Sequence, residues 1–327
     1  KIHLNNFRRM QQEIQQFKES DYGGYINLIN TIYPKHPISL ESKLHEDKLR
    51  EKKIYFKKLV LKNDRNLFAA LTINQWEDAY HPDKYVMNIF VHPKYEQKGI
   101  GELLYKYMED LLLPRNPVKI TSEVWEPHVQ SISFLEKRGF KLAATEIECK
   151  MDLQKYNPKE NCEKIDRILK SGFHLITLHQ LRQKDKEADR KIWEFEREVA
   201  PDMPWTDEIT VQDYPVYKEQ VLQHPKFDSR AWLLVMKGDE IAGLNNLWKS
   251  NLKMELNNGL TGVRRKYRRQ GVATALKHAN LKWANEEGFQ SVKTDNESTN
   301  NGMLNINIEA GFEFMPSWLY FEKTKFY

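Results

Sequence analysis

One glycine-containing loop occurs twice in this chain, as KYEQKGIG at 94–101 and as KYRRQGVA at 266–273. The two loop glycines, Gly99 and Gly271, are 172 positions apart, and a second glycine pair, Gly139 and Gly311, has the same spacing. Seven identities fall at this single ungapped offset, within about fifty residues of each copy: Val91/Val263, Lys94/Lys266, Tyr95/Tyr267, Gly99/Gly271, Leu104/Leu276, Gly139/Gly311 and Phe140/Phe312. A repeat of this length predicts two copies of one domain.

The length of the chain fits this interpretation. Its 327 residues correspond to about two domains of ~150 residues. The segment 152–173 is polar and interrupts the repeated pattern. We therefore expect an N-terminal domain at 1–153, a linker at 154–172 and a C-terminal domain at 173–327.

Local patterns agree between the copies. Strands are predicted at 85–91 and 256–263, each running into one of the loops, and shorter strands at 118–125 and 291–296. Apolar residues at helical spacing follow the loops: Ile100, Leu103, Leu104, Tyr107, Met108 and Leu111 in the first copy, and Val272, Leu276, Ala279 and Trp283 in the second, with Gly288 as a C-cap glycine. A further helix ends near Gly139 and near Gly311, and a hairpin precedes each loop. The fold class is therefore α/β, with a mixed (α+β) sheet and helices on its faces in each domain.

Composition excludes several classes of protein. The 51 Lys and Arg residues against 46 Asp and Glu leave a charge of only +5, which does not favour nucleic acid over other partners. The N-terminal stretch 1–17 has no continuous apolar segment, so neither a signal peptide nor a membrane span is expected there. Two cysteines, Cys149 and Cys162, form neither a disulfide framework nor a metal cluster. Free thiols in a reducing cytoplasm are the simplest expectation.

The repeated loop has the properties of an anion site. A glycine loop between a strand and a helix leaves backbone N–H groups pointing outward, and the helix dipole adds positive charge there. Glycine at 99 and 271 allows close approach of a ligand. No Gly-Lys-Ser/Thr follows, so the loop is not a P-loop, and it is not a G-x-G-x-x-G fingerprint either.

This order of elements resembles the GNAT acetyltransferase superfamily, whose loop pattern Arg/Gln-x-x-Gly-x-Gly/Ala binds the pyrophosphate of acetyl-CoA. Arg268, Gly271 and Ala273 match that pattern fully, whereas the first copy has Glu96 in place of the Arg or Gln. The resemblance covers nearly all of the chain. It implies two tandem GNAT (acyl-CoA N-acyltransferase) domains.

The resemblance also implies where acetyl-CoA is bound. Pantetheine is expected between the fourth and fifth strands of a copy, where strand backbone bonds it and one N–H stabilises the oxyanion. Residues expected to contact the cofactor in the second copy are Leu260, Thr261, Gly262, Val263, Arg268, Arg269, Gln270, Gly271, Val272, Ala273, Thr274, Asn296 and Asn300. Those in the first copy are Ile89, Phe90, Val91, Gln97, Lys98, Gly99, Ile100, Gly101 and Glu102. A helix-capping role is the alternative for Asn296 or Asn300.

The sequence indicates the catalytic residues less directly than the cofactor contacts. The transfer needs a base that removes a proton from the attacking amine, and the candidates are Glu255, Asp295 and Glu123, with an exposed strand glutamate as the alternative for Glu255. The family often has a tyrosine as general acid four residues before the Gly of Gly-Phe. That position is Leu135 in the first copy and Asn307 in the second, so the acid stays unassigned.

The sequence therefore predicts an acetyl-CoA-dependent N-acetyltransferase acting on the amine of a small molecule. The second copy is expected to be catalytic, because Glu96 would repel a pyrophosphate where Arg268 would bind it. Two alternatives stay open: a non-catalytic acyl-CoA-binding or regulatory module, and acyl transfer from another donor such as aminoacyl-tRNA. The protein is expected to be a monomer or homodimer without nucleic-acid or membrane partners.

Overall fold

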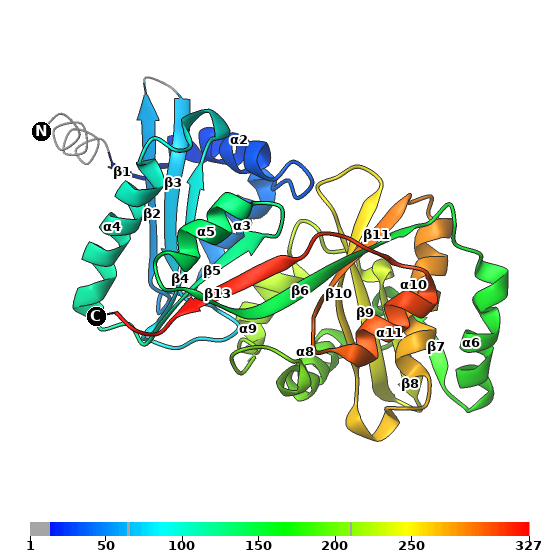
Figure 1. Cartoon of the computed structure of the whole chain (residues 1–327). Coiled ribbons are helices and arrows are strands. Elements are labelled where there is room, and N and C mark those ends of the chain that lie inside the picture. Colours follow the sequence, from blue (N-terminus) through cyan, green and yellow to red (C-terminus); the bar gives the residue numbers. More distant parts are fainter. Residues whose placement is uncertain (1–13, 64–65, 210, 327) are drawn as a thin grey trace, which may run out of the picture. The chain divides into compact units, whose positions relative to one another are not determined.

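The computed structural model describes residues 14–63, 66–209 and 211–326, and the chain divides into two compact units. The first unit contains the described residues up to Val124 together with His128–Ala143 and the C-terminal residues from Tyr320. The second unit contains Trp125–Pro127 and Ala144–Leu319. Both are mixed α/β structures, as the sequence predicted (Figure 1). Residues 1–13 of the N-terminal stretch considered above lie outside the described residues.

The first unit has the strand and helix order that the repeat predicted. Its elements are β1 (Gln15–Gln16), α2 (Tyr22–Ile32), α3 (Leu40–Leu49), β2 (Phe56–Asn63), β3 (Asn66–Asn74), β4 (Lys84–Val91), α4 (Ile100–Leu112), β5 (Lys119–Trp125) and α5 (Val129–Glu136). Strands β1 to β4 are antiparallel neighbours in chain order, and β5 is parallel to β4. The predicted hairpin is formed by β2 and β3.

The second unit repeats this order from β7 onward. Its elements are β6 (Lys141–Asp152), α6 (Pro158–Lys170), β7 (His174–Thr177), α7 (Leu178–Lys184), α8 (Ala188–Val199), α9 (Tyr214–Tyr217), β8 (Trp232–Lys237), β9 (Glu240–Lys249), β10 (Glu255–Val263), α10 (Val272–Glu286), β11 (Ser291–Glu297), α11 (Asn301–Ala310) and β12 (Glu313–Phe314). The last strand, β13 (Trp318–Lys323), belongs to the first unit from Tyr320 onward. The β8–β9 hairpin turns at Gly238, as predicted. β11 is parallel to β10.

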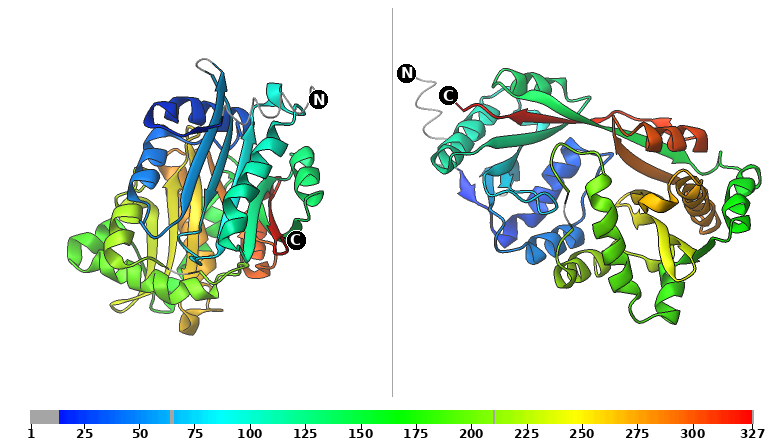
Figure 2. Two further views of the ribbon diagram at one scale, coloured as in Figure 1. Left: turned by 90° about the vertical axis from the view of Figure 1, so that its left-hand side faces the viewer. Right: turned by 90° about the horizontal axis from the view of Figure 1, so that it is seen from below.

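Each unit contains a strand that the chain order would assign to the other copy. β6 follows the last helix of the first copy, but it pairs antiparallel with β11 over seven residues, from Glu146 to Asp152. β13 is the last strand of the chain and is the neighbour of β5 (red in Figure 2). An ion pair of 2.7 Å between Lys119 Nζ and Glu322 Oε1 joins β5 to β13. The repeat therefore predicts the elements but not this exchange of strands.

The segment expected to act as a linker contributes to the core of the second unit. It contains helix α6, whose Ile168 packs in one apolar cluster with Ala275 and Leu276 of α10. Tyr156 lies just before α6, and its hydroxyl donates a hydrogen bond of 3.0 Å to the carbonyl of His278. α10 is therefore covered by the sheet on one side and by α6 on the other.

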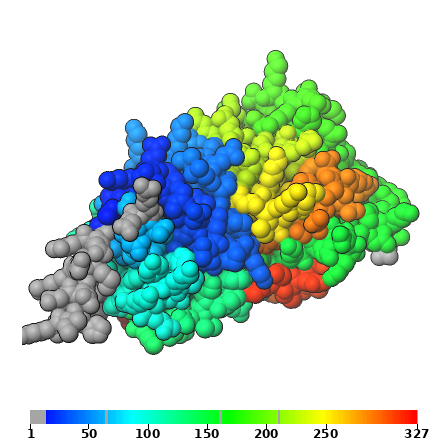
Figure 3. Space-filling view, turned by 90° about the horizontal axis from the view of Figure 1, so that it is seen from above, coloured from blue at the N-terminus to red at the C-terminus, as the bar shows by residue number. Residues whose placement is uncertain are grey.

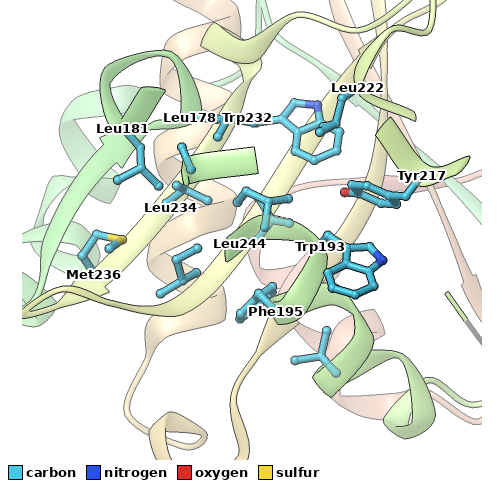
Figure 4. Close-up of a cluster of buried hydrophobic side chains, with 14 residues drawn as sticks. Leu178, Leu181, Trp193, Phe195, Tyr217, Leu222, Trp232, Leu234, Met236 and Leu244 are labelled. Carbon is cyan, nitrogen blue, oxygen red and sulfur yellow. The ribbon is translucent and has the colours of Figure 1, made fainter. Parts of the chain in front are cut away.

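The opposite side of the second unit's sheet is packed by α7 and α8. Trp193 and Phe195 of α8 meet Trp232, Leu234 and other side chains of β8 and β9 in a buried cluster (Figure 4). Gly262 of β10 lies under this helix, because a Cβ added there would come within 3.0 Å of Val199. Helix α8 is thus fixed against the end of β10 that runs into the loop.

Two further observations bear on the predictions. Cys149 is buried and Cys162 exposed, and both are free thiols. Of the helices in the described ranges, none combines the length and the apolar composition needed to cross a bilayer.

Candidate functional site

In each unit two parallel strands pair at their beginnings and then part. β4 and β5 are paired from Lys84 to Val86 only, and β10 and β11 from Glu255 to Asn258 only. Within the described residues, the remainder of β10, 259–263, has its sheet partner in β9 alone. We call the space between the parted strands the strand gap of each unit. Each gap opens toward the glycine loop.

The two loops have the same backbone conformation. Glu96 and Arg268 are extended, with φ angles of −62° and −67°. The next residues, Gln97 and Arg269, have positive φ angles of 57° and 61°. Gly99 and Gly271 precede the helices with φ angles of 80° and 84°, a region that other residues rarely adopt.

Each loop presents the beginning of a helix. The first intrahelical hydrogen bonds are donated by Leu103 to the carbonyl of Gly99 and by Ala275 to the carbonyl of Gly271. The N–H groups of residues 100–102 and 272–274 precede those bonds and are therefore available to a ligand. Together with the dipole of a 13- or 15-residue helix, they suit a phosphate group.

The side chains around the second loop are cationic and are held by acidic partners. Arg265 and Arg268 both pair with Asp202, at 2.5 Å each. The two guanidinium groups, Arg265 first, hold the pKa of Asp202 well below its usual range. Asp202 belongs to the turn that follows α8, so packing of that helix places it beside the loop. Because Arg265 is 78% exposed, these pairs are accessible and replaceable by another anion.

The first loop carries acidic side chains where the second has cationic or neutral ones. Glu96 replaces Arg268, and Glu102 in the first turn of α4 stands at the position of Thr274. The carboxylate of Glu102 is bonded by Arg138. Gly101 is packed against the ring of Phe134, at 3.3 Å from an added Cβ. The first loop thus retains the anion-site backbone without the matching charge.

The strands beside the two loops also differ. β10 has a register shift between Asn258 and Thr261, so that Gly259 and Leu260 stand opposite one residue of β9. This β-bulge turns the Leu260 N–H out of the ladder, and it donates to Asn246 Oδ1 at 2.8 Å. β4 pairs with β3 in unbroken register from Val86 to Val91. Ile89, Phe90 and Val91 therefore remain in a regular ladder.

The three predicted bases lie in different surroundings. Glu255 begins β10 directly after a surface turn (yellow in Figure 3), and it is 4% exposed. Its carboxylate accepts hydrogen bonds from Lys150 at 2.7 Å, Ser291 at 3.2 Å and Ser250 at 3.2 Å. Asp295 lies one residue beyond the last β10–β11 pair and is exposed. Glu255 is thus fixed by an ion pair, whereas Asp295 is an exposed residue of β11 just beyond the point where β10 and β11 part.

Glu123 occupies in the first unit the position of Asp295 in the second. It is partly buried, and desolvation raises the pKa of its carboxyl despite hydrogen bonds from Asn88 and Tyr320. Tyr320 comes from β13, so the C-terminal strand helps to form this environment. Burial first, and then the nearby charge of Glu123, raise the pKa of the Tyr33 phenol. A carboxyl of this kind is suited to accept a proton near neutral pH.

Asparagines line the side of the second gap that faces α11. Asn307 is fully buried, and its Nδ2 donates to Asn296 Oδ1 at 2.6 Å. Its own Oδ1 has no hydrogen-bond partner among the described residues, which is unusual for a buried amide. Asn300 caps α11 by accepting a hydrogen bond from the Met303 N–H. In the first unit the position of Asn307 is held by Leu135, which is 3% exposed.

A buried polar cluster under α10 was not predicted. Lys277 is 1% exposed, and its Nζ donates a hydrogen bond of 2.8 Å to Asn258 Oδ1. Asn245 Nδ2 donates to the same oxygen, and Asn280 donates to the Asn245 carbonyl. Burial lowers the pKa of Lys277 to about 7. The sequence did not mark Lys277 as buried, because a lysine within a predicted helix is normally exposed. The feature that could have drawn attention to it is its alignment with Tyr105 of the first copy at the offset of 172.

Comparisons with known proteins agree with this architecture. A model of the acetyltransferase (GNAT) family matches residues 24–140 and again 192–306. A tandem GNAT protein from the clavulanic acid biosynthesis pathway has a TM-score of 0.70 at 17% identity, covering 95% of this chain and 98% of that one. A GCN5-related N-acetyltransferase from Sphaerobacter thermophilus has a TM-score of 0.69 at 16% identity, covering 95% and 94%.

A third similar structure is a glucosamine N-acetyltransferase region of a fungal multi-domain β-N-acetylglucosaminidase. It has a TM-score of 0.69 at 14% identity, and the match covers 95% of this chain but 38% of that one. No curated protein matches the chain. At these identities the solved structures show a shared fold of two GNAT domains.

Proposed function

Because this chain belongs to the acetyltransferase (GNAT) family, we propose that it transfers the acetyl group of acetyl-CoA to the amine of a small molecule, in the second unit. The observation that carries this proposal is the second loop. There the anion-binding backbone of Gly271 and the first turn of α10 coincides with Arg265 and Arg268. The first loop has the same backbone but carries Glu96 and Glu102.

The second loop would hold the pyrophosphate through backbone and side chains together. The N–H groups of 272–274 supply donors without any conformational change. Arg268 already has its Nε bonded to the Val263 carbonyl at 2.9 Å, which leaves the outer nitrogens for the ligand. One of them, Nη2, donates to Asp202 Oδ2 in the structure, so a phosphate would take the place of that carboxylate.

The strand gap of the second unit would orient the rest of the donor. The five residues of β10 that have parted from β11, 259–263, span about 16 Å at 3.3 Å per residue. This extended backbone suits pantetheine, whose thioester supplies the acetyl group. The buried Oδ1 of Asn307 is an acceptor without a partner in the described structure, and it suits an amide N–H of that arm.

Asp295 is the base that this geometry favours for the attacking amine. It projects from β11 on the face opposite Asn296, because successive side chains of a strand alternate. It lies just past the point where the strands part. Glu255 is committed to Lys150 and two serines, and we assign it to holding β10, β11 and β6 together.

The first unit, in this proposal, does not bind acetyl-CoA. Two carboxylates at its loop oppose a pyrophosphate, and its β4 lacks the bulge of β10. Glu123 retains the character of an amine-binding group. We expect the protein to work in a reducing compartment such as the cytoplasm, since both cysteines are free.

Calorimetry with acetyl-CoA and release of CoA across a panel of primary amines test the proposal. We expect one molecule of acetyl-CoA per chain and turnover with at least one amine. Tight binding without turnover on any amine favours a regulatory acyl-CoA module. Binding of aminoacyl-tRNA with no response to acetyl-CoA would overturn the proposal in favour of a different donor.

A further inference from the structure

Acetyl transfer requires a proton for the sulfur that leaves, and the second unit has no tyrosine at the family position. Asn307 stands there, and an amide does not act as an acid near neutral pH. Its Nδ2 is also engaged by Asn296. Another group on this side of the strand gap has to supply the proton.

We infer that Lys277, from within α10, is the residue that protonates the departing sulfur of CoA. This inference rests on the proposed function and adds to it the identity of the general acid. Lys277 Nζ is bonded to Asn258, which is the last residue of β10 paired with β11. The ammonium group is therefore at the closed end of the strand gap, the end away from the phosphate-binding loop.

The surroundings of Lys277 keep it available as a donor. An ammonium group has three N–H donors, and Asn258 Oδ1 is the single hydrogen-bond acceptor recorded for Nζ in the described part of the chain. The ring of Phe312 is 5.4 Å away. The charged form of Lys277 is thus destabilised by burial, and no ion pair within the described residues compensates for it.

The pKa of Lys277 differs from those of two titratable groups near it, Cys149 and His278. Burial lowers its own pKa to about 7, so the ammonium group can give up its proton near neutral pH. Cys149 of β6 faces it, but burial raises the pKa of that thiol to about 11. His278, the next residue of α10, has a pKa lowered to about 4 by burial and is turned toward Tyr156 and Lys164. Since an alkyl thiol has a pKa of about 8.5, Lys277 can protonate it and Cys149 cannot.

The proposed step balances as follows. The neutral amine attacks the acetyl carbonyl carbon, and its C–N bond forms as the C–S bond breaks. The electron pair of the C–S bond goes to sulfur, and sulfur takes a proton from the Lys277 ammonium. The proton lost by the amine goes to Asp295 and then to water, and neutral Lys277 regains a proton from water after CoA leaves.

The asparagines around Lys277 act as positioning residues. Asn245 and Lys277 donate to the same Asn258 oxygen, and Asn280 holds Asn245 from one turn further along α10. The first unit lacks this arrangement. It has Tyr105 at the position of Lys277, and that hydroxyl accepts a hydrogen bond of 2.8 Å from Lys323.

Binding of CoA and of desulfo-CoA, which lacks the sulfur, tests the inference without a known acceptor. At pH 8 we expect the unmodified protein to bind CoA ~5-fold more tightly than desulfo-CoA, because the CoA thiol donates a hydrogen bond to the neutral Lys277 amine, and one hydrogen bond changes affinity by about that factor. Lys277→Met should bind the two within ~2-fold of each other. Lys282→Met, which removes an exposed lysine of the same helix, should keep the preference of the unmodified protein.

The possible outcomes distinguish the inference from the proposed function. If Lys277→Met binds both ligands and keeps the preference for CoA, Lys277 is not in contact with the sulfur and the inference is overturned. If the unmodified protein binds neither ligand, the proposed function fails as well. Mass spectrometry that finds Lys277 acetylated after incubation with acetyl-CoA would also overturn it, since the lysine would then be a nucleophile.

Kinetics with the best amine of the panel give a second readout. Lys277→Met should lower kcat by ~10²-fold or more with little change in KM for acetyl-CoA, the range expected for loss of a general acid. In the unmodified protein kcat should fall as pH rises above about 7, where Lys277 loses its proton. A kcat profile with the same fall in Lys277→Met would contradict the inference.

Discussion

Gly99 and Gly271 have φ angles within four degrees of each other, at 80° and 84°, and Glu96 and Arg268 are equally close in conformation. The two loops nevertheless have opposite charge at the residue that, in our proposal, would face a bound pyrophosphate. The backbone of the loop is required for the strand to turn into the helix in either unit. The charge, in our proposal, is required only in the second unit, which would bind the cofactor.

The side chains between each sheet and the helix after its loop, α4 or α10, differ in polarity between the two units. In the second unit the residues there are polar: Asn258, Lys277, Asn280, Asn296 and Asn307. Their counterparts in the first unit are buried and, except for one tyrosine, apolar: Met87, Tyr105, Met108, Val124 and Leu135. Buried polar groups cost stability, so their presence in the second unit supports our proposal that this unit binds the cofactor.

The largest effect should come from filling the loop of the second unit. Gly271→Glu forces a side chain into a left-handed conformation and places a carboxylate in the phosphate position. We expect acetyl-CoA affinity to fall by more than ~100-fold in calorimetry. Gly99→Glu makes the same change at φ 80° in the first loop. Equal losses in the two variants would mean that both loops bind the cofactor.

Exchanging the loop charges should have a smaller effect. Arg268→Glu is expected to weaken acetyl-CoA binding by about 10- to 100-fold, since a hydrogen bond to a charged group contributes ~1.5–3 kcal/mol. The reciprocal variant, Glu96→Arg, should leave the affinity of the second unit unchanged. The stoichiometry of the titration shows whether this variant binds a second molecule of acetyl-CoA in the first unit. Unaltered affinity in Arg268→Glu would show that the Arg268 side chain does not contact acetyl-CoA.

The repeat in the sequence predicted most of the elements compared above. An offset of 172 placed both loops, and the helices after them, because strand and helix periodicities are local properties of the chain. The partners of β6 and β13 were not predictable in this way. Both are ordinary strand segments, and which sheet they join depends on contacts more than a hundred residues away.

Lys277 escaped prediction for a related reason. The helical pattern marked Val272 and Leu276 as the buried stripe of α10, and a lysine beside that stripe is read as exposed. Lys277 is instead buried against Asn258 of β10 and the ring of Phe312, which follows α11. Sequence periodicity describes one helix at a time and does not show which polar groups of the sheet that helix covers.

Removing the buried charge of the second unit should stabilise the protein in a pH-dependent manner. The pKa of Lys277 is lowered to about 7 in the folded state, so below pH 7 the folded protein contains a buried ammonium. Lys277→Met should raise the free energy of unfolding by about 3–4 kcal/mol at pH 6, since a pKa lowered from 10.5 to about 7 corresponds to ~5 kcal/mol and the lost hydrogen bond to Asn258 offsets about 1 kcal/mol. The gain should diminish as pH rises through 7 toward 10.5, and denaturant unfolding at pH 6 and 9.5 measures it.

The buried carboxyl of the first unit should show the opposite dependence. The pKa of Glu123 is raised by burial, so the folded protein is penalised once pH exceeds that pKa. Glu123→Gln should raise the free energy of unfolding at pH 8, because the folded protein no longer has to bury a carboxylate, and it should do so by progressively less as pH falls toward 4.5. A pH-independent gain in denaturant midpoint would show that Glu123 does not titrate differently in the folded protein.

The exchange of strands also has a consequence for biosynthesis. β13, which lies beside β5, is translated about 195 residues after it, a delay of ~10–40 s at 5–20 residues per second. The sheet of the first unit therefore stays incomplete until β13 has been made, and the edge of β5 needs protection from other exposed strands in that interval. The half of the chain that is made first is thus the half that is completed last.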